Sequence, residues 1–158
     1  MRGHQLFAAG ISVAVLLGGA ASPVLAHESK PAGPRIKGKG RTAEAAHVSV
    51  SVRADRLEKG RFDWRSRDGR FKVRCEGFDS YSQRVYIQPG PPAAVVKSSD
   101  CVLKGPRGRT PVTVEAEFVD NSSFTPGAKD EANLTFTRRN GSQISDSGAM
   151  RSGDITVR

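Results

Sequence analysis

The residues whose types and spacing could do chemistry are four cations at the tip of a predicted β-hairpin: Arg65, Arg67, Arg70 and Lys72. The register derived below places Arg67 opposite Arg70 and Arg65 opposite Lys72. Like charges directly opposite each other in a sheet are destabilising. One interpretation is an anion-binding tip. The other is a solvated basic face, which protects a sheet edge from aggregation.

The sequence offers no motif for enzymatic catalysis. It contains no G-x-S-x-G elbow, no H-E-x-x-H pair and no phosphate-cradling glycine loop, so we assign no catalytic residue. Glu115 and Glu117 share one face of a predicted strand. A hydrolase that uses paired carboxylates on extracellular polysaccharide is therefore the alternative function. A solvated outer face is the simpler interpretation, because the two residues alternate with apolar ones.

A loop between two predicted strands carries several oxygen ligands of the type that calcium uses, and its weak calcium candidates are Asp120, Asn121 and Asp130. The loop does not match the EF-hand pattern, and Lys129 argues against a dense anionic cage. The competing interpretation is a turn in which Asp120 and Asp130 accept hydrogen bonds from backbone N–H groups. We expect no other cofactor.

The two cysteines, Cys75 and Cys101, are predicted to form a disulfide, because an even cysteine count in an exported protein is typical of one. The alternative is two free, buried thiols. Closing this loop would stabilise the fold by ~3.5 kcal/mol in the chain-entropy model. A metal site is disfavoured because no C-x-x-C spacing exists.

The predicted hairpin runs from Lys59 to Phe78, with Asp68-Gly69 as its two-residue type I′ turn. The alternation of apolar and polar residues on both sides of the turn fixes the register. The predicted pairs are Arg67–Arg70, Ser66–Phe71, Arg65–Lys72, Trp64–Val73, Asp63–Arg74, Phe62–Cys75 and Arg61–Glu76. All apolar partners fall on one face, as a correct register requires.

Residues 1–26 resemble a secretory signal peptide, with Arg2 as the positive region, an apolar run over 6–17 and cleavage after Ala26. The run is too short for a transmembrane helix, which needs ~20 residues. We therefore expect a secreted protein with no membrane span after cleavage. A retained anchor is the alternative.

Residues 27–46 are rich in glycine, proline, lysine and arginine, and Ile36 is their only large apolar side chain. Such a segment buries too little surface to offset its ordering entropy, so it is predicted to be a flexible basic linker. Its charge suits weak contact with anionic polymers or lipid head groups, although a solvated spacer is the simpler interpretation.

Residues 47–158 alternate with a period of two and show no helical stripe. Short apolar runs, of which Val48-Ser49-Val50-Ser51-Val52 is the clearest, are separated by clusters of Gly, Pro, Asn, Asp and Ser. This pattern predicts a single all-β domain, an antiparallel sandwich or barrel.

The last third of the chain resembles the secreted all-β "post-COAP" domains of bacterial exported proteins. The matching features are the strand over 112–121, a loop with Gly127 and Asp130, the strand over 134–137 and the closing segment 147–157. Asp154 stands where that group has Asn. The resemblance implies a β-rich exported module and assigns no reaction.

Together these features predict a secreted, non-catalytic and monomeric binding or structural module of the cell surface. Its expected partner is an anionic polymer, contacted through the hairpin tip and the basic linker. The net charge of +9 alone indicates only non-specific attraction. Nucleic acid is the least favoured partner, because no recognition motif accompanies the charge.

Overall fold

The computed structural model describes residues 33–84 and 89–158, and they form a single curled antiparallel sheet. The prediction of an all-β domain is confirmed, and its sheet is a half-barrel. The elements are β1 (Arg35–Arg41), β2 (His47–Arg53), the 3₁₀ turn η1 (Leu57–Lys59), β3 (Arg61–Arg65), β4 (Lys72–Glu76), β5 (Ser80–Arg84), β6 (Ala93–Gly105), β7 (Gly108–Val119), α1 (Asn121–Phe124), β8 (Glu131–Arg138), β9 (Gln143–Ala149) and β10 (Ser152–Val157).

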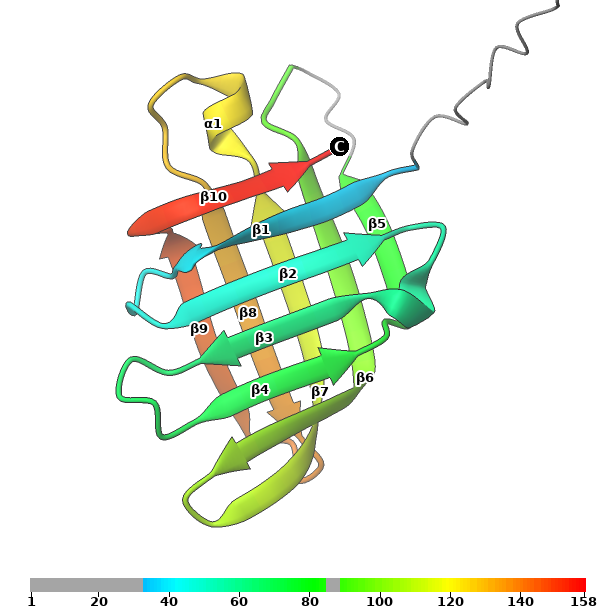
Figure 1. Cartoon of the computed structure of the whole chain (residues 1–158), viewed down its shortest axis with the longest axis vertical. Coiled ribbons are helices and arrows are strands. Elements are labelled where there is room, and N and C mark those ends of the chain that lie inside the picture. The colour runs from blue at the N-terminus through cyan, green and yellow to red at the C-terminus, as the bar shows by residue number, and fades with distance from the viewer. Residues whose placement is uncertain (1–32, 85–88) are drawn as a thin grey trace, which may run out of the picture. The chain divides into compact units, whose positions relative to one another are not determined.

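The sheet folds into two layers (Figure 1). Strands β10, β1, β2, β3 and β4 lie side by side nearest the viewer, and β5, β7, β8 and β9 lie behind them. The strand order is β10-β1-β2-β3-β4-β6-β7-β8-β9, and β5 also pairs with β6. The C-terminal strand β10 is thus an edge of the front layer, next to the first strand of the described chain.

Strand β6 joins the two layers. Its first half pairs with β5, its second half pairs with β4, and its register against β7 shifts between Ser98 and Cys101. An irregularity of this kind bends a strand and increases its twist, which lets one strand serve both layers. Cys101 lies directly opposite Cys75 of β4, and the two form a buried disulfide, as predicted.

The core lies between the layers and follows the period-two pattern. Phe62 and Trp64 of β3 project inward against Phe136 of β8, with ring centroids 6.2 and 4.9 Å from that of Phe136. The valines of β2 are buried on the same side. Because alternate residues point to opposite faces, burial of this set sends the remaining side chains of β2 and β3 to the outer surface.

The predicted hairpin register is confirmed for the five pairs from Arg61–Glu76 to Arg65–Lys72. The predicted type I′ turn is wrong, because Asp68 does not have the positive φ that such a turn requires. Instead the Gly69 N–H donates to the Ser66 carbonyl oxygen, and within the turn only Gly69 has a positive φ, of 70°. Asp68 accepts hydrogen bonds from the Ser66 hydroxyl and the Arg70 N–H, which favours the observed turn.

The prediction of a flexible linker over residues 27–46 is wrong for β1, which lies between β2 and β10 in the sheet. Its glycines allow close packing. A Cβ on Gly38 would overlap the Asp154 carbonyl oxygen, and one on Gly40 would overlap that of Ser152. Ile36 is only 1% exposed, so this segment contributes to the core.

The predicted signal peptide, its cleavage after Ala26 and the first residues of the predicted linker lie outside the described residues. In the described part of the chain, no helix has the length and apolar character needed to cross a membrane.

Candidate anion-binding face

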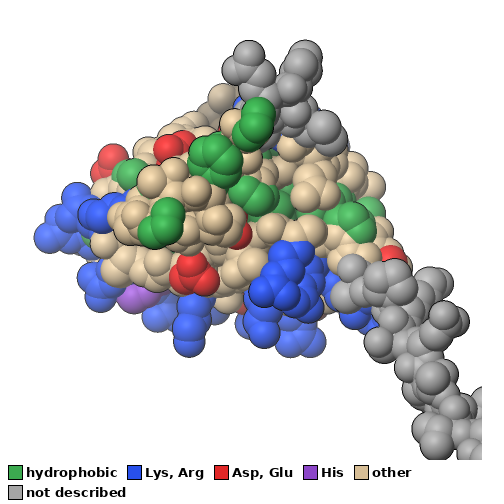
Figure 2. Space-filling view, turned by 90° about the horizontal axis from the view of Figure 1, so that it is seen from above, with side chains coloured by type: hydrophobic (Ala, Val, Ile, Leu, Met, Phe, Trp, Pro, Cys, Tyr) green, Lys and Arg blue, Asp and Glu red, His purple; other side chains and the backbone are tan. Residues whose placement is uncertain are grey.

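The outer surface of the front layer carries many Lys and Arg side chains, and we call it the basic face. It comprises the outward side chains of β10, β1, β2, β3 and β4, continued by the second half of β6 and the start of β7. Its cations are Arg158, Arg35, Lys37, Lys39, Arg41, Arg53, Arg61, Arg65, Lys72, Arg74, Lys104 and Arg109. Seen from above, Lys and Arg side chains gather along this side of the molecule (Figure 2).

Strand β1 contributes a column of four cations to this face. Arg35, Lys37, Lys39 and Arg41 alternate with the inward residues Ile36, Gly38 and Gly40. Two residues of an extended strand span about 6.7 Å, so the four side chains are spread along about 20 Å. The strand therefore presents its charge at regular intervals on one surface.

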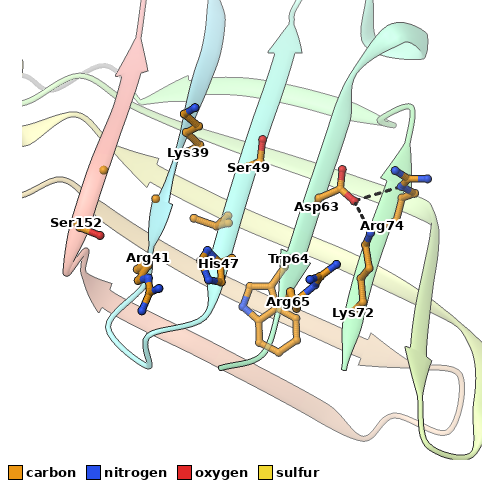
Figure 3. A pocket seen from close by; sticks show the side chains of 13 residues that line it. Lys39, Arg41, His47, Ser49, Asp63, Trp64, Arg65, Lys72, Arg74 and Ser152 are labelled. Carbon is orange, nitrogen blue, oxygen red and sulfur yellow. Dashed lines mark hydrogen bonds and ion pairs between the residues drawn. The ribbon is translucent and has the colours of Figure 1, made fainter. Parts of the chain in front are cut away.

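A shallow groove of about 650 Å³ crosses the centre of the face. Figure 3 shows the side chains that line it, with Arg41, His47, Arg65 and Lys72 along one line and Lys39, Ser49, Asp63 and Arg74 along the next. Each line follows directly opposed residues of adjacent strands. The groove is thus formed by regular sheet geometry and not by a loop.

Asp63 is the only carboxylate that lines this groove. Its Oδ1 lies 3.2 Å from Arg74 Nε and 3.6 Å from Lys72 Nζ. The other cations along the groove, Lys39, Arg41 and Arg65, form no ion pair within the described residues. The groove therefore retains an excess of positive charge that an anion in solution could neutralise.

The structure brings only two of the four predicted anion-binding residues into this groove. Arg65 and Lys72 line it, whereas Arg67 and Arg70 belong to the turn beyond the last strand pair. Arg70 Nε lies 3.6 Å from Asp68 Oδ2. Hydrogen bonds from Ser66 and the Arg70 N–H hold the pKa of Asp68 below its ordinary value. The hairpin tip thus has its own counter-charge.

Sequence reasoning expected the cations of β1 to contact an anionic polymer from a flexible linker, and it did not predict that they lie on a strand beside the hairpin. A signal was present, since in Arg-Ile-Lys-Gly-Lys-Gly-Arg every second residue is basic. That spacing is the period of a strand with one charged face. Lys104 and Arg109 were also missed, because only the pairing of β4 with β6 and of β6 with β7 brings them beside Lys72. Arg74 was predicted only as the partner of Asp63, and it lines the groove.

The calcium candidates are occupied by hydrogen bonds within the protein. Asp120 accepts from the N–H groups of Ser123 and Val157, at 2.9 and 3.1 Å. Asp130 accepts from those of Ser122 and Ile155, at 2.9 and 2.8 Å. This matches the alternative in which both carboxylates bond backbone N–H groups. Each carboxylate ties the loop to β10.

The Asn121 side chain also serves the loop. It donates to the Lys129 carbonyl oxygen at 3.0 Å and to Glu131 Oε1 at 3.2 Å. No cluster of three or more metal-ligating side chains occurs among the residues that the structure describes. The hydrogen bonds of Asp120, Asn121 and Asp130 give each of these residues a structural role.

Glu115, Glu117 and Asp146 lie away from the groove. Glu115 and Glu117 project from the outer surface of the back layer, where Lys97 lies 3.0 Å from Glu115 and Arg84 lies 2.8 Å from Glu117. Asp146 is buried, and its Oδ2 accepts hydrogen bonds from Trp64 Nε1 at 2.8 Å and Thr42 Oγ1 at 2.6 Å. It thereby joins β9 to the front layer.

Comparison with known proteins identifies no relative: no family model, curated protein or solved structure matches this chain. The resemblance of its last third to the post-COAP domains therefore stays a prediction. The geometry and charge of the basic face are therefore the basis for a proposed function.

Proposed function

We propose that this protein is a secreted, non-catalytic module that binds anionic polymers at the cell surface or outside the cell. The observation that carries the proposal is the basic face, where cations of β1, β3 and β4 meet on one surface. The Cys75–Cys101 disulfide supports an oxidising location, because such bonds persist mainly in exported proteins.

The mode of binding follows from how the charges are held. The cations lie on paired strands and not on loops, so their backbone is already ordered before a ligand binds. Their side chains remain long, solvated and separated by small polar residues such as Ser49 and Ser51. Such a surface suits a repeated charge pattern more than a single small anion.

The experiment compares retention of the protein on immobilised anionic polymers (heparin and teichoic acid) with retention on neutral dextran. The test variant changes Lys39, Arg41, Arg65 and Lys72 to Ser. The matched control loses the same charge away from the basic face, at Lys59, Lys97, Lys129 and Arg139. We expect the parent and the control to be retained only on the anionic polymers, and the test variant to be released early. Equal retention of the two variants would contradict the proposal.

A further inference from the structure

One line of directly opposed residues across the basic face carries a basic residue on each of β1, β2, β3, β4, β6 and β7, and ends at Ser152 on β10. It runs through Arg41 of β1, His47 of β2, Arg65 of β3 and Lys72 of β4, and the pairing of β4 with β6 and of β6 with β7 continues it to Lys104 and Arg109. We call these six residues the basic row. Figure 3 shows its first four members in sequence.

The neighbouring line, two residues along each strand, has a different composition. It passes through Lys39, Ser49, Asp63, Arg74 and Val102. It thus includes a carboxylate, a hydroxyl and an apolar side chain. Positive charge on the face is therefore concentrated in the basic row and in the β1 column, which meet at Arg41.

The basic row has little local compensation. Within the described residues, Lys72 is the only member in an ion pair, with Asp63. Directly opposed like charges disfavour a sheet, and here they follow one another across several strands. Adjacent strands lie about 4.8 Å apart, so the row extends over about 24 Å. A row of positively charged side chains of this length is complementary to an extended chain of negative charges.

The chemistry of the face favours phosphate as the repeating group. Arg presents a planar fork that binds tetrahedral oxyanions through two hydrogen bonds, and three of the row's members are Arg. Bases and sugar rings are commonly held by exposed aromatic side chains. Two aromatic residues adjoin the row: Trp64 is only 6% exposed and points into the core, and Phe71 is partly buried against the core. Nothing in the row selects for a ring.

We propose that an extended chain of phosphate groups binds along the basic row, across the strands of the front layer. This inference rests on the proposed function and adds the ligand chemistry, its direction and its minimum length. The chain contacts Arg41 at one end and Arg109 at the other. A chain that spans only half the row engages half of these cations.

The experiment measures the affinity of the folded protein for linear polyphosphates of defined length by fluorescence anisotropy at fixed salt. We expect affinity to increase by at least about tenfold as the chain grows to span about 24 Å, and then to level off, because each added contact releases counterions until the row is filled. Heparin oligosaccharides and single-stranded DNA of matched length serve as competitors. Tighter binding of heparin than of polyphosphate would overturn the choice of phosphate. Tighter binding of single-stranded DNA would overturn the inference that the row does not recognise a ring.

Two variants of equal charge test the direction of binding. The row variant changes Arg65, Lys104 and Arg109 to Ser, and the column variant changes Arg35, Lys37 and Lys39 to Ser. We expect the row variant to lose the dependence on length and the column variant to keep it at lower affinity. Thermal melts of both variants check that each of them is folded.

The two proposals fail in different ways. If the column variant loses the length dependence and the row variant keeps it, the direction is wrong while the proposed function stands. If affinity does not depend on the length of the polyphosphate, the inferred binding along the row is wrong, and the proposed function still stands. If the parent binds none of the polyanions, both proposals are wrong.

Discussion

Asp120 and Asp130 should act as a latch that holds the C-terminal strand, and removing either carboxylate should destabilise the fold. In the pairing of β10 with β1, the N–H groups of Ile155 and Val157 point away from β1, toward the open edge of the layer. Asp130 and Asp120 accept hydrogen bonds from these two groups. The latch thereby satisfies an edge that would otherwise be free to pair with another strand.

The magnitude for Asp120→Ala follows from two lost contacts. One is the hydrogen bond to Ser123 N, which caps α1 and whose loss costs about 1 kcal/mol. The other leaves the N–H of Val157, a residue only 3% exposed, without its partner, at about 1–3 kcal/mol. We expect a total loss of about 2–4 kcal/mol in the free energy of unfolding. Asp120→Asn should cost less, because the amide oxygen can still accept a hydrogen bond.

Urea denaturation measures these losses, and hydrogen exchange of the Ile155 and Val157 amides reports the latch directly. Asp55→Ala is the matched control, because Asp55 is an exposed carboxylate whose ion pair with Arg53 is screened by solvent and should contribute little to stability. If Asp120→Ala unfolds at the same urea concentration as the control, the latch is not a stabilising feature. A rise in stability on adding calcium to the parent protein would instead support the calcium interpretation.

Three further perturbations test the fold and the face. Deleting residues 153–158 removes the buried Ile155 and Val157 and should prevent cooperative folding, so a truncated protein that still melts in one sharp transition would contradict the placement of β10. Gly40→Ala should destabilise by about 1–3 kcal/mol in urea titrations, because its Cβ would overlap the Ser152 carbonyl oxygen, whereas Gly33→Ala meets nothing closer than 3.7 Å and should be nearly neutral. Asp63→Asn frees Lys72 and Arg74 and should raise polyphosphate affinity about fivefold by anisotropy, and an unchanged or lower affinity would place the ligand elsewhere.

The sequence was sufficient to predict the all-β class, the hairpin register and the disulfide. These features depend on local alternation and on a cysteine pair, both of which are visible without tertiary information. The turn was not predictable to the same degree. Side-chain hydrogen bonds of Ser66 and Asp68 select a conformation that the Asp-Gly pair alone does not specify.

Strand β1 was mistaken for a linker because glycine has two opposite uses. Glycine loosens an isolated chain, but Gly38 and Gly40 here permit close contact with β10, which lies more than 100 residues later in the sequence. The basic row was hidden for a similar reason. The pairing of β4 with β6 passes over β5, so the approach of Lys104 and Arg109 to Lys72 depends on topology that no local pattern reveals.

The most direct test of the basic face is the salt dependence of polyphosphate binding. At pH 7 the basic row contributes about five positive charges, so log K should fall with log salt concentration at a slope of about −3.5. The variant with Lys39, Arg41, Arg65 and Lys72 changed to Ser keeps two of these five charges and should retain a slope of about −1.4. The matched control with Lys59, Lys97, Lys129 and Arg139 changed to Ser should keep the slope of the parent. Equal slopes of log K against log salt concentration for the parent and both variants would show that the basic face is a solvated surface and not a binding site.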